Sequence, residues 1–239
     1  MPNSKLGSHY SQAYDAELHQ AVVCLLQMAT LAQQQLTDAM AAFTTANLTL
    51  AQQVKAFDRK VNTFEVEISE HCLLILARRQ PAASDLRLVL SVLKAVNDIE
   101  RIGDLAKRIA KVLLKEPDSN RPQPAQLGQL TLMGTKVLQM LSRALVAFER
   151  VDASEALTVL RADSAIDADY AGITQQCLQD MRQNAEKITT SLQIMQVAKA
   201  LERVGDHARN ICEHTIFLRT SRNVAHLSDT ELQQVVDEG

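Results

Sequence analysis

Residues 98–104 read DIERIGD and residues 200–206 read ALERVGD. The first stretch continues as LAKRI and the second as HARNI, so a twelve-residue segment recurs 102 residues later in the chain. Recurrence of a segment at a fixed spacing indicates an internal repeat, and a repeat determines the architecture. We therefore predict that the chain contains two copies of one structural unit.

A second polar pair precedes each copy of this segment. Asp58 and Asn62 stand four residues apart before the first copy, and Asp163 and Asp167 stand four apart before the second. The spacing between Asp58 and Asp163 is 105 residues, three more than the spacing between the motifs downstream. Such a small difference over this distance fits a tandem duplication in which one copy has lost a few loop residues.

The composition favours helices over strands. Hydrophobic residues make up 46% of the 239 residues, but aromatic residues only 3%, with no Trp, 7 Gly and 5 Pro. A chain of this kind has an aliphatic core and few tight turns, which is typical of long helices. We therefore predict an all-α protein made of two tandem three-helix bundles.

Apolar residues recur at intervals of three and four along most of the chain, which indicates amphipathic helices. Asn47 and Asp152 are suited to cap helix amino termini, and Pro81 is suited to end a helix. The six helices predicted in this way span approximately residues 10–46, 47–79, 84–114, 125–148, 152–183 and 189–218.

Residues 116–124 read EPDSNRPQP and contain three of the five prolines, which indicates a linker. After it, Ser228 and Glu231 have the spacing of a capping box, so the acidic tail can end in a short helix, weakly anchored because it has few apolar residues. The predicted organisation is a first bundle over 10–116, a linker over 117–124, a second bundle over 125–220 and a tail over 221–239.

The charge and the cysteines restrict the partners and the compartment. A formal net charge of −3 gives no basic field for a nucleic-acid backbone, so nucleic acid is not expected as the main partner. No signal-peptide pattern or membrane-spanning run is recognisable, so any membrane contact would be peripheral. The four cysteines lack a CxxC pair, which favours reduced thiols in a cytoplasmic protein; they are Cys24, Cys72, Cys177 and Cys212.

The carboxylate pairs are the candidate binding sites. Residues four apart on a helix lie on one face, one turn apart, so Glu100 and Asp104 repel each other unless a cation lies between them. Two helices can converge such pairs in each half, and oxygen ligands suit Mg²⁺, Ca²⁺, Mn²⁺ or iron, with Zn²⁺ not distinguishable. The predicted metal ligands are Asp58, Asn62, Glu100, Asp104, Asp163, Asp167, Glu202 and Asp206.

The alternative is that these acids form ordinary ion pairs with nearby arginines, as solvated acids usually do. Other chemistry has less support. No histidine has Glu three residues before it, which excludes a ferritin-like di-iron site. The paired histidines His207 and His214 could reach a metal, but such residues are more often packed or exposed. Without a phosphate-binding loop, a GxSxG motif or a nucleophile beside its base, enzymatic activity is not expected.

The segments DIERIGD, ALERVGDHARNICEH and RRQPAASDLRLVL together resemble the PhoU family, accessory regulators of the bacterial phosphate-specific transport system. The resemblance covers both halves and implies two tandem three-helix bundles without enzymatic activity. It also implies a negative regulator of the phosphate-starvation response, which limits phosphate uptake when phosphate is plentiful. The implied partners are the ATPase subunit of the transporter and the membrane histidine kinase, and exposed apolar helix faces would allow a homodimer.

The resemblance also implies metal binding, because some members of the family bind metal, including multinuclear iron clusters, through E/D-x-x-x-D motifs. Two departures bear on this. Asn62 replaces a carboxylate in the first half, and the second half has no counterpart of Pro81, Asp85 and Arg87. Asp85 is either a first-turn acid favoured by the helix dipole or a ligand or partner contact. A metal storage or sensing protein is the alternative function, and a metal-dependent hydrolase is a third.

Overall fold

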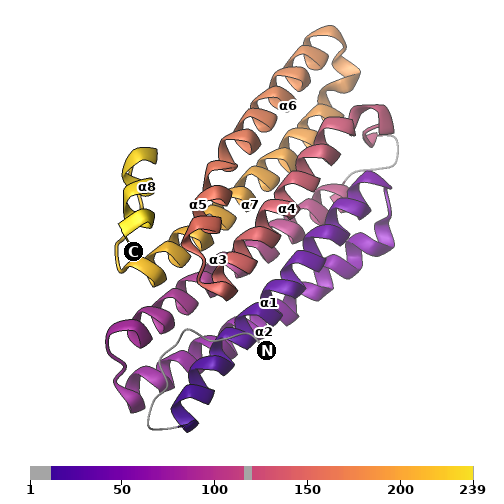
Figure 1. Cartoon of the computed structure of the whole chain (residues 1–239). Helices are drawn as coiled ribbons and strands as arrows, with labels where there is room; N and C mark the ends of the chain where they lie inside the picture. Colours follow the sequence, from indigo (N-terminus) through magenta and orange to yellow (C-terminus); the bar gives the residue numbers. More distant parts are fainter. Residues whose placement is uncertain (1–11, 116–119, 239) are drawn as a thin grey trace.

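The structure is a computed structural model, and it describes residues 12–115 and 120–238. Within these residues the chain forms helices and no strand, which confirms the predicted all-α class (Figure 1). The helices of the first half are α1 (Gln12–Thr44), α2 (Leu48–Arg79) and α3 (Ala83–Lys115). Those of the second half are α4 (Gly128–Arg150), α5 (Ala153–Arg161), α6 (Asp163–Gln183) and α7 (Ile188–Thr220), followed by α8 (Asp229–Glu238).

The predicted caps lie where the sequence indicates. The Asn47 side chain accepts a hydrogen bond from the backbone N–H of Leu50 at 3.0 Å, and Asp152 accepts one from Glu155 at 3.0 Å. These bonds satisfy backbone donors that have no partner inside the helix. The single helix predicted over 152–183 is wrong, however, because it is divided into α5 and α6 at Ala162.

The interruption at Ala162 has a local cause. The N–H of Ala162 donates to the carbonyl of Val159, and Ala165 donates to Ala162, three residues back instead of four. The Ser164 hydroxyl also donates to the carbonyl of Arg161 at 3.2 Å. Ser and Asp side chains compete for backbone groups in this way and favour helix starts. As a result Asp163 begins a new helix.

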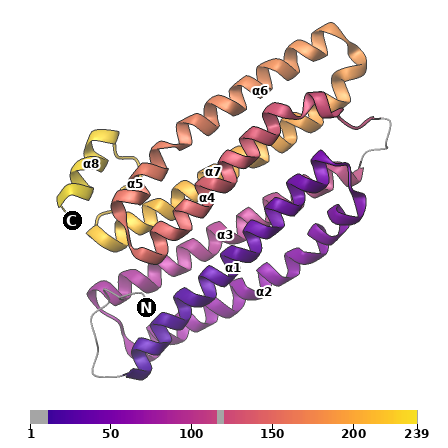
Figure 2. The same ribbon diagram turned by 45° about the vertical axis from the view of Figure 1, so that its right-hand side comes forward.

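The two halves pack along their length into one core. α3 packs against α7, and α1 packs against α4, so the halves lie side by side (Figure 2). Their buried apolar side chains form a single continuous cluster that includes residues of both halves, such as Ile99 and Val204. No helix of the described residues is both long enough and apolar enough to cross a membrane. The domain boundaries stay a prediction, and residues 116–119 of the predicted linker lie outside the described part.

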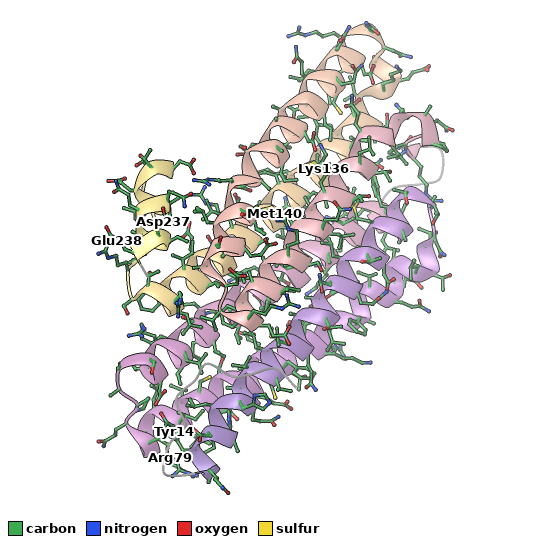
Figure 3. The ribbon with its side chains drawn as sticks, in the orientation of Figure 1. Tyr14, Arg79, Lys136, Met140, Asp237 and Glu238 are labelled. Atoms are coloured by element: carbon green, nitrogen blue, oxygen red, sulfur yellow. The ribbon has the colours of Figure 1, made fainter. Side chains whose placement is uncertain are left out.

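At one end of the first half, polar contacts join all three helices. Tyr14 and Arg79 meet there (Figure 3), with the guanidinium 6.0 Å from the ring centroid. Arg79 also donates to Glu17 at 2.7 and 2.9 Å, and the Tyr14 hydroxyl donates to Asp85 at 3.1 Å. Burial and this hydrogen bond raise the pKa of Tyr14 to about 12. Asp85 therefore fastens α3 to α1, beyond its place in the first turn of a helix.

The tail is better anchored than the sequence indicates. The predicted capping box is present, since the Ser228 N–H donates to Glu231 at 2.8 Å. Leu232 and Val235 are buried against the rest of the chain, and Arg161 on α5 pairs with Asp229 on α8 at 3.0 Å. The expectation of weak anchoring is wrong because all three apolar residues of α8 pack against the core, Val236 being partly buried.

Candidate functional site

The first carboxylate cluster consists of Asp58 and Asn62 on α2 with Glu100 and Asp104 on α3. Asp58 is buried, and the ammonium group of Lys107 lies 2.5 Å from its Oδ2 atom. The same ammonium group lies 3.5 Å from Oδ1 of Asp104. A cation supplied by the chain itself therefore stands between carboxylates of the two helices.

The remaining acids of the first cluster also have cationic neighbours. Arg101 lies 3.5 Å from Glu100 and 3.7 Å from Asp104. Burial raises the pKa of Glu100 above its ordinary value, and the nearby Asp104 carboxylate raises it further. Asn62 is exposed and adds no charge. The charged acids of the first cluster therefore form ion pairs within the chain, as the alternative interpretation expected.

The second carboxylate cluster consists of Asp163 and Asp167 on α6 with Glu202 and Asp206 on α7. Its most buried member, Asp163, lies 3.7 Å from Arg209, the position equivalent to Lys107. That contact is long, and the Nε atom of Arg209 pairs with Glu213 instead, at 3.3 Å. Asp163 therefore lacks the close internal cation that Asp58 has.

Burial and the mutual repulsion of the carboxylates raise pKa values in the second cluster. Burial, together with the carboxylates of Asp167, Asp206 and Glu202, raises the pKa of Asp163 to about 6, and Arg209 offsets only part of this. Burial and Glu202 likewise raise the pKa of Asp206. One Glu202 oxygen accepts from Lys199 at 2.6 Å, whereas the other is buried without a hydrogen-bond partner in the described structure. This cluster holds more negative charge than its surroundings neutralise.

Glycines let the helices approach each other beside both clusters. A Cβ atom on Gly103 would lie 3.1 Å from Oε1 of Gln35 and 3.4 Å from a methyl group of Val61. A Cβ atom on Gly205 would lie 3.3 Å from Oδ1 of Asp163 and 3.4 Å from Ile166. The helices therefore pack closely at both glycines.

The eight predicted ligands thus fall into the two clusters expected. Among the described residues, however, no three His, Cys, Asp or Glu side chains meet in an arrangement that would hold a metal ion. The donor chemistry of the second cluster fits a hard cation, with a buried, unpartnered oxygen on Glu202 and mutual repulsion to relieve. In the first cluster Lys107 already occupies the cationic position. Metal binding stays a prediction.

Comparison with known proteins decides the family. The PhoU domain model matches residues 25–113 and 130–215, once in each half. The phosphate-specific transport system accessory protein PhoU of Serratia marcescens is 38% identical over 99% of this chain and 96% of its own length. The chain belongs to the PhoU family. The resemblance stated from the sequence is confirmed.

Solved PhoU structures agree with this assignment. The crystal structure of PhoU from Pseudomonas aeruginosa has a TM-score of 0.82 and 40% identity, covering 87% of this chain and 100% of that one. The phosphate transport system regulatory protein PhoU from Streptococcus pneumoniae has a TM-score of 0.81 and 31% identity, covering 88% and 99%. The predicted fold of two tandem PhoU bundles is confirmed.

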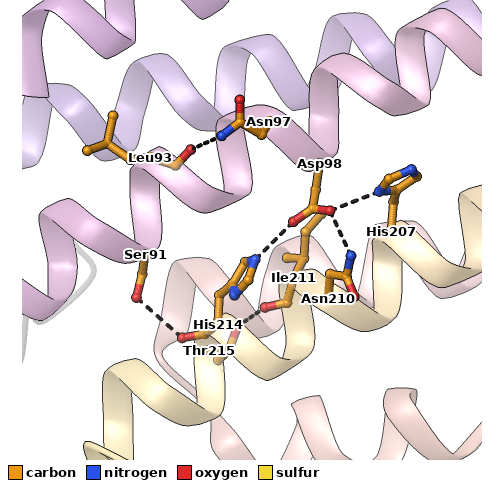
Figure 4. Close-up of polar contacts among 9 residues, drawn as sticks. All are labelled: Ser91, Leu93, Asn97, Asp98, His207, Asn210, Ile211, His214 and Thr215. Atoms are coloured by element: carbon orange, nitrogen blue, oxygen red, sulfur yellow. Dashed lines mark hydrogen bonds and ion pairs between the residues drawn. The ribbon is translucent and has the colours of Figure 1, made fainter. Parts of the chain in front are cut away.

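A polar network between the two PhoU repeats was not predicted. Asp98 on α3 accepts hydrogen bonds from three α7 side chains: from His207 at 2.8 Å, from Asn210 at 2.9 Å and from His214 at 2.9 Å (Figure 4). Burial pushes the pKa of Asp98 upward, but these hydrogen bonds outweigh it and lower the pKa to about 2. The histidines thus serve the contact between the halves.

The sequence did carry a signal for this network. Asp98 corresponds in the second copy to Ala200, and His207 corresponds in the first copy to Leu105. A charged residue that replaces an apolar one in only one copy of a repeat indicates a contact that only one copy makes. The differences at Asp98 and His207 thus mark a contact between the two copies.

Proposed function

We propose that this chain is a cytoplasmic negative regulator of phosphate uptake, an adaptor that connects a phosphate transporter to the histidine kinase of the phosphate-starvation response. The observation that carries the proposal is the match of both halves to the PhoU family model, together with relatives named phosphate-specific transport system accessory proteins. In this role the chain works by binding other proteins. It limits uptake when phosphate is plentiful.

The shape of the molecule supports binding to proteins. Long helices offer extended faces, and large apolar side chains stand exposed on them, with Val66 at 54%, Leu73 at 58% and Leu132 at 65% exposure. Val66 and Leu73 are seven residues apart on α2 and so share one face. Exposed apolar groups of this kind often mark interaction surfaces. The proposed contacts are with the transporter ATPase subunit, the kinase and a second copy of the chain.

The deciding experiment is a phosphate-repressible alkaline phosphatase reporter in phosphate-replete cells that lack this chain. We expect constitutive reporter activity that falls again when the gene is restored. The double variant Val66→Ser with Leu73→Ser, restored in the same way, would test the α2 face, with Leu178→Ser on α6 as an exposed apolar control. Normal repression in the deleted strain would overturn the proposal.

Metal binding is the second candidate, favoured by the unneutralised charge of the second cluster. A bound divalent cation would supply the positive charge that Lys107 supplies in the first half, and Asp163, Asp167, Glu202 and Asp206 would hold it. We expect the purified chain to retain metal after dialysis and the double variant Glu202→Gln with Asp206→Asn to lose it, as measured by elemental analysis. The matched variant Glu100→Gln with Asp104→Asn should change the metal content less. Equal metal content in all three proteins would contradict this assignment.

A further inference from the structure

A groove between α3 and α7 concentrates positive charge in an otherwise acidic chain. Its volume is about 270 Å³, and it is lined by eight residues from these two helices. They comprise five cationic side chains, one histidine, one carboxylate and one leucine, namely Arg101, Lys107, Arg108, Lys111, Arg203, His207, Asp104 and Leu105. Since the formal net charge of the whole chain is −3, this concentration of cations is a local feature of the groove.

Three of these cations have no carboxylate partner among the described residues. Arg101 and Lys107 are engaged with the first carboxylate cluster, at distances between 2.5 and 3.7 Å. By contrast, no ion pair within residues 12–115 and 120–238 involves Arg108, Lys111 or Arg203, and all three side chains are exposed. Unpaired cations that face one concave site attract anions and raise their local concentration.

The repeat explains how the cations come to face one another. Arg101, Arg108 and Lys111 recur at helical spacing on one face of α3, and Arg203 with His207 are one turn apart on α7. Arg101 and Arg203 are equivalent positions of the two copies, so the duplication itself places an arginine on each wall. His207 is held in place by its 2.8 Å hydrogen bond to Asp98 (Figure 4). One side chain of the α7 wall is therefore held in place before any ligand arrives.

We propose that this groove binds a small anion that carries a chain of phosphate groups. Arginine and lysine recognise phosphate through charge-assisted hydrogen bonds. From Arg101 to Lys111 the α3 wall is about 15 Å long at the rise of a helix, longer than a single phosphate and suited to several in a row. The lining residues include no Phe, Tyr or Trp ring on which a base could stack, and the single imidazole, that of His207, is hydrogen-bonded to Asp98. The phosphate chain itself is therefore the recognised part.

The test is isothermal titration of the full chain with sodium tripolyphosphate, pyrophosphate, ATP and inorganic phosphate at low and moderate salt. We expect tripolyphosphate to bind more tightly than inorganic phosphate, with an affinity that falls as salt rises. Tight binding of ATP together with tripolyphosphate would show that a nucleotide can supply the phosphate chain. Tripolyphosphate binding without ATP binding would identify the inorganic chain as the ligand. Inorganic phosphate binding as tightly as tripolyphosphate would overturn the proposal.

The groove variant replaces the three cations that form no ion pair. Replacing Arg108, Lys111 and Arg203 together by Gln should weaken tripolyphosphate binding by about tenfold or more, because three charge-assisted contacts are lost. The control replaces three exposed cations outside the groove by Gln, with the same change in net charge: Lys55, Arg59 and Arg182. Circular dichroism would establish that both proteins are folded, and the single variant Arg203→Gln provides a milder second test. An equal loss in the control, or no loss in the groove variant, would overturn the site.

A single-stranded oligonucleotide is the competing class of ligand. If it bound more tightly than tripolyphosphate and lost affinity in the same groove variant, the groove would be a nucleic-acid surface and the proposal would fail. The titration uses the purified chain alone and does not rest on the adaptor role. A negative titration would not affect the conclusion drawn from the reporter experiment. A negative reporter experiment would likewise not affect the conclusion about the groove.

Discussion

The two carboxylate clusters come from the same repeat but differ in how their buried aspartate is neutralised. In the first half Asp58 has the Lys107 ammonium group at 2.5 Å, whereas in the second half Asp163 has the Arg209 guanidinium at 3.7 Å. Burial and the neighbouring carboxylates raise the pKa of Asp163 to about 6, and Arg209 offsets only part of this. The two copies therefore share the placement of their acids but differ in how the charge of those acids is balanced. One buried aspartate has a close internal cation and its counterpart does not.

The largest effect on stability is expected from removing Lys107, the internal cation of the first cluster. Lys107→Met should leave Asp58 buried without its partner and lower the free energy of unfolding by about 3 kcal/mol. Arg209→Met removes only a long contact and should cost about 1 kcal/mol or less. Urea unfolding followed by circular dichroism measures both. Equal losses would remove the distinction between the halves.

Substituting the two equivalent aspartates should change stability in opposite directions. Asp58→Asn leaves the Lys107 charge without its closest partner and should cost about 2 kcal/mol. Asp163→Asn removes a carboxylate whose ionised form is disfavoured by folding, and should stabilise the chain at neutral pH by about 1 to 2 kcal/mol. Chemical unfolding at pH 7 decides this, and a loss in both variants would contradict it.

The same difference predicts a pH dependence. Because the pKa of Asp163 is higher in the folded chain than in the unfolded chain, the folded state binds more protons between about pH 4 and pH 7. The contribution of Asp163 to stability should therefore fall as the pH rises through this range. The difference in unfolding free energy between Asp163→Asn and the unmodified chain should grow over the same range. A constant difference would show that Asp163 titrates normally.

Substitution of the glycine beside each cluster should lower the stability of the chain by a similar amount. Gly103→Leu and Gly205→Leu each force a branched side chain into a close helix contact and should each cost about 1 to 2 kcal/mol. Thermal unfolding compares them. Similar costs would show that the helix geometry is common to both halves and that only the charges differ, while an unchanged melting temperature in either variant would contradict the close packing.

The smallest difference between the halves is expected in the reactivity of two equivalent thiols. Cys72 and Cys177 occupy corresponding positions, and burial raises the pKa of both, to about 11 for Cys72. Neither should react with iodoacetamide in the folded chain at neutral pH, and the same holds for the buried Cys212. Mass spectrometry should find one adduct, on the partly exposed Cys24. Rapid modification of Cys177 but not Cys72 would show that the second half opens more readily.

The features of the fold that depend on local sequence patterns could be predicted from the sequence. Apolar periodicity, Asn47 and Asp152 gave the helices, and the repeat gave the two bundles. It did not predict the break at Ala162, because apolar residues such as Leu160 and Ile166 continue through it and the cause is a local competition for backbone carbonyls.

The sequence placed the eight carboxylate and amide residues in two clusters but could not assign their charge partners. Lys107 and Arg209 occupy equivalent positions, and only the three-dimensional arrangement distinguishes 2.5 Å from 3.7 Å. The Asp98 network was missed for a related reason. Its residues are more than a hundred positions apart, and no helical period connects α3 with α7.

The Asp98 network also has a consequence for the relation between the two copies. Asp98 stands where the second copy has Ala200, and its three partners stand where the first copy has Leu105, Arg108 and Val112. Asp98 now requires histidine and asparagine on the opposite copy, and those residues would have no acceptor in a symmetric pair. Neither half can replace the other, and a dimer of either half would lack half of the network. The two copies are complementary at this junction, since one supplies the acceptor and the other supplies the donors.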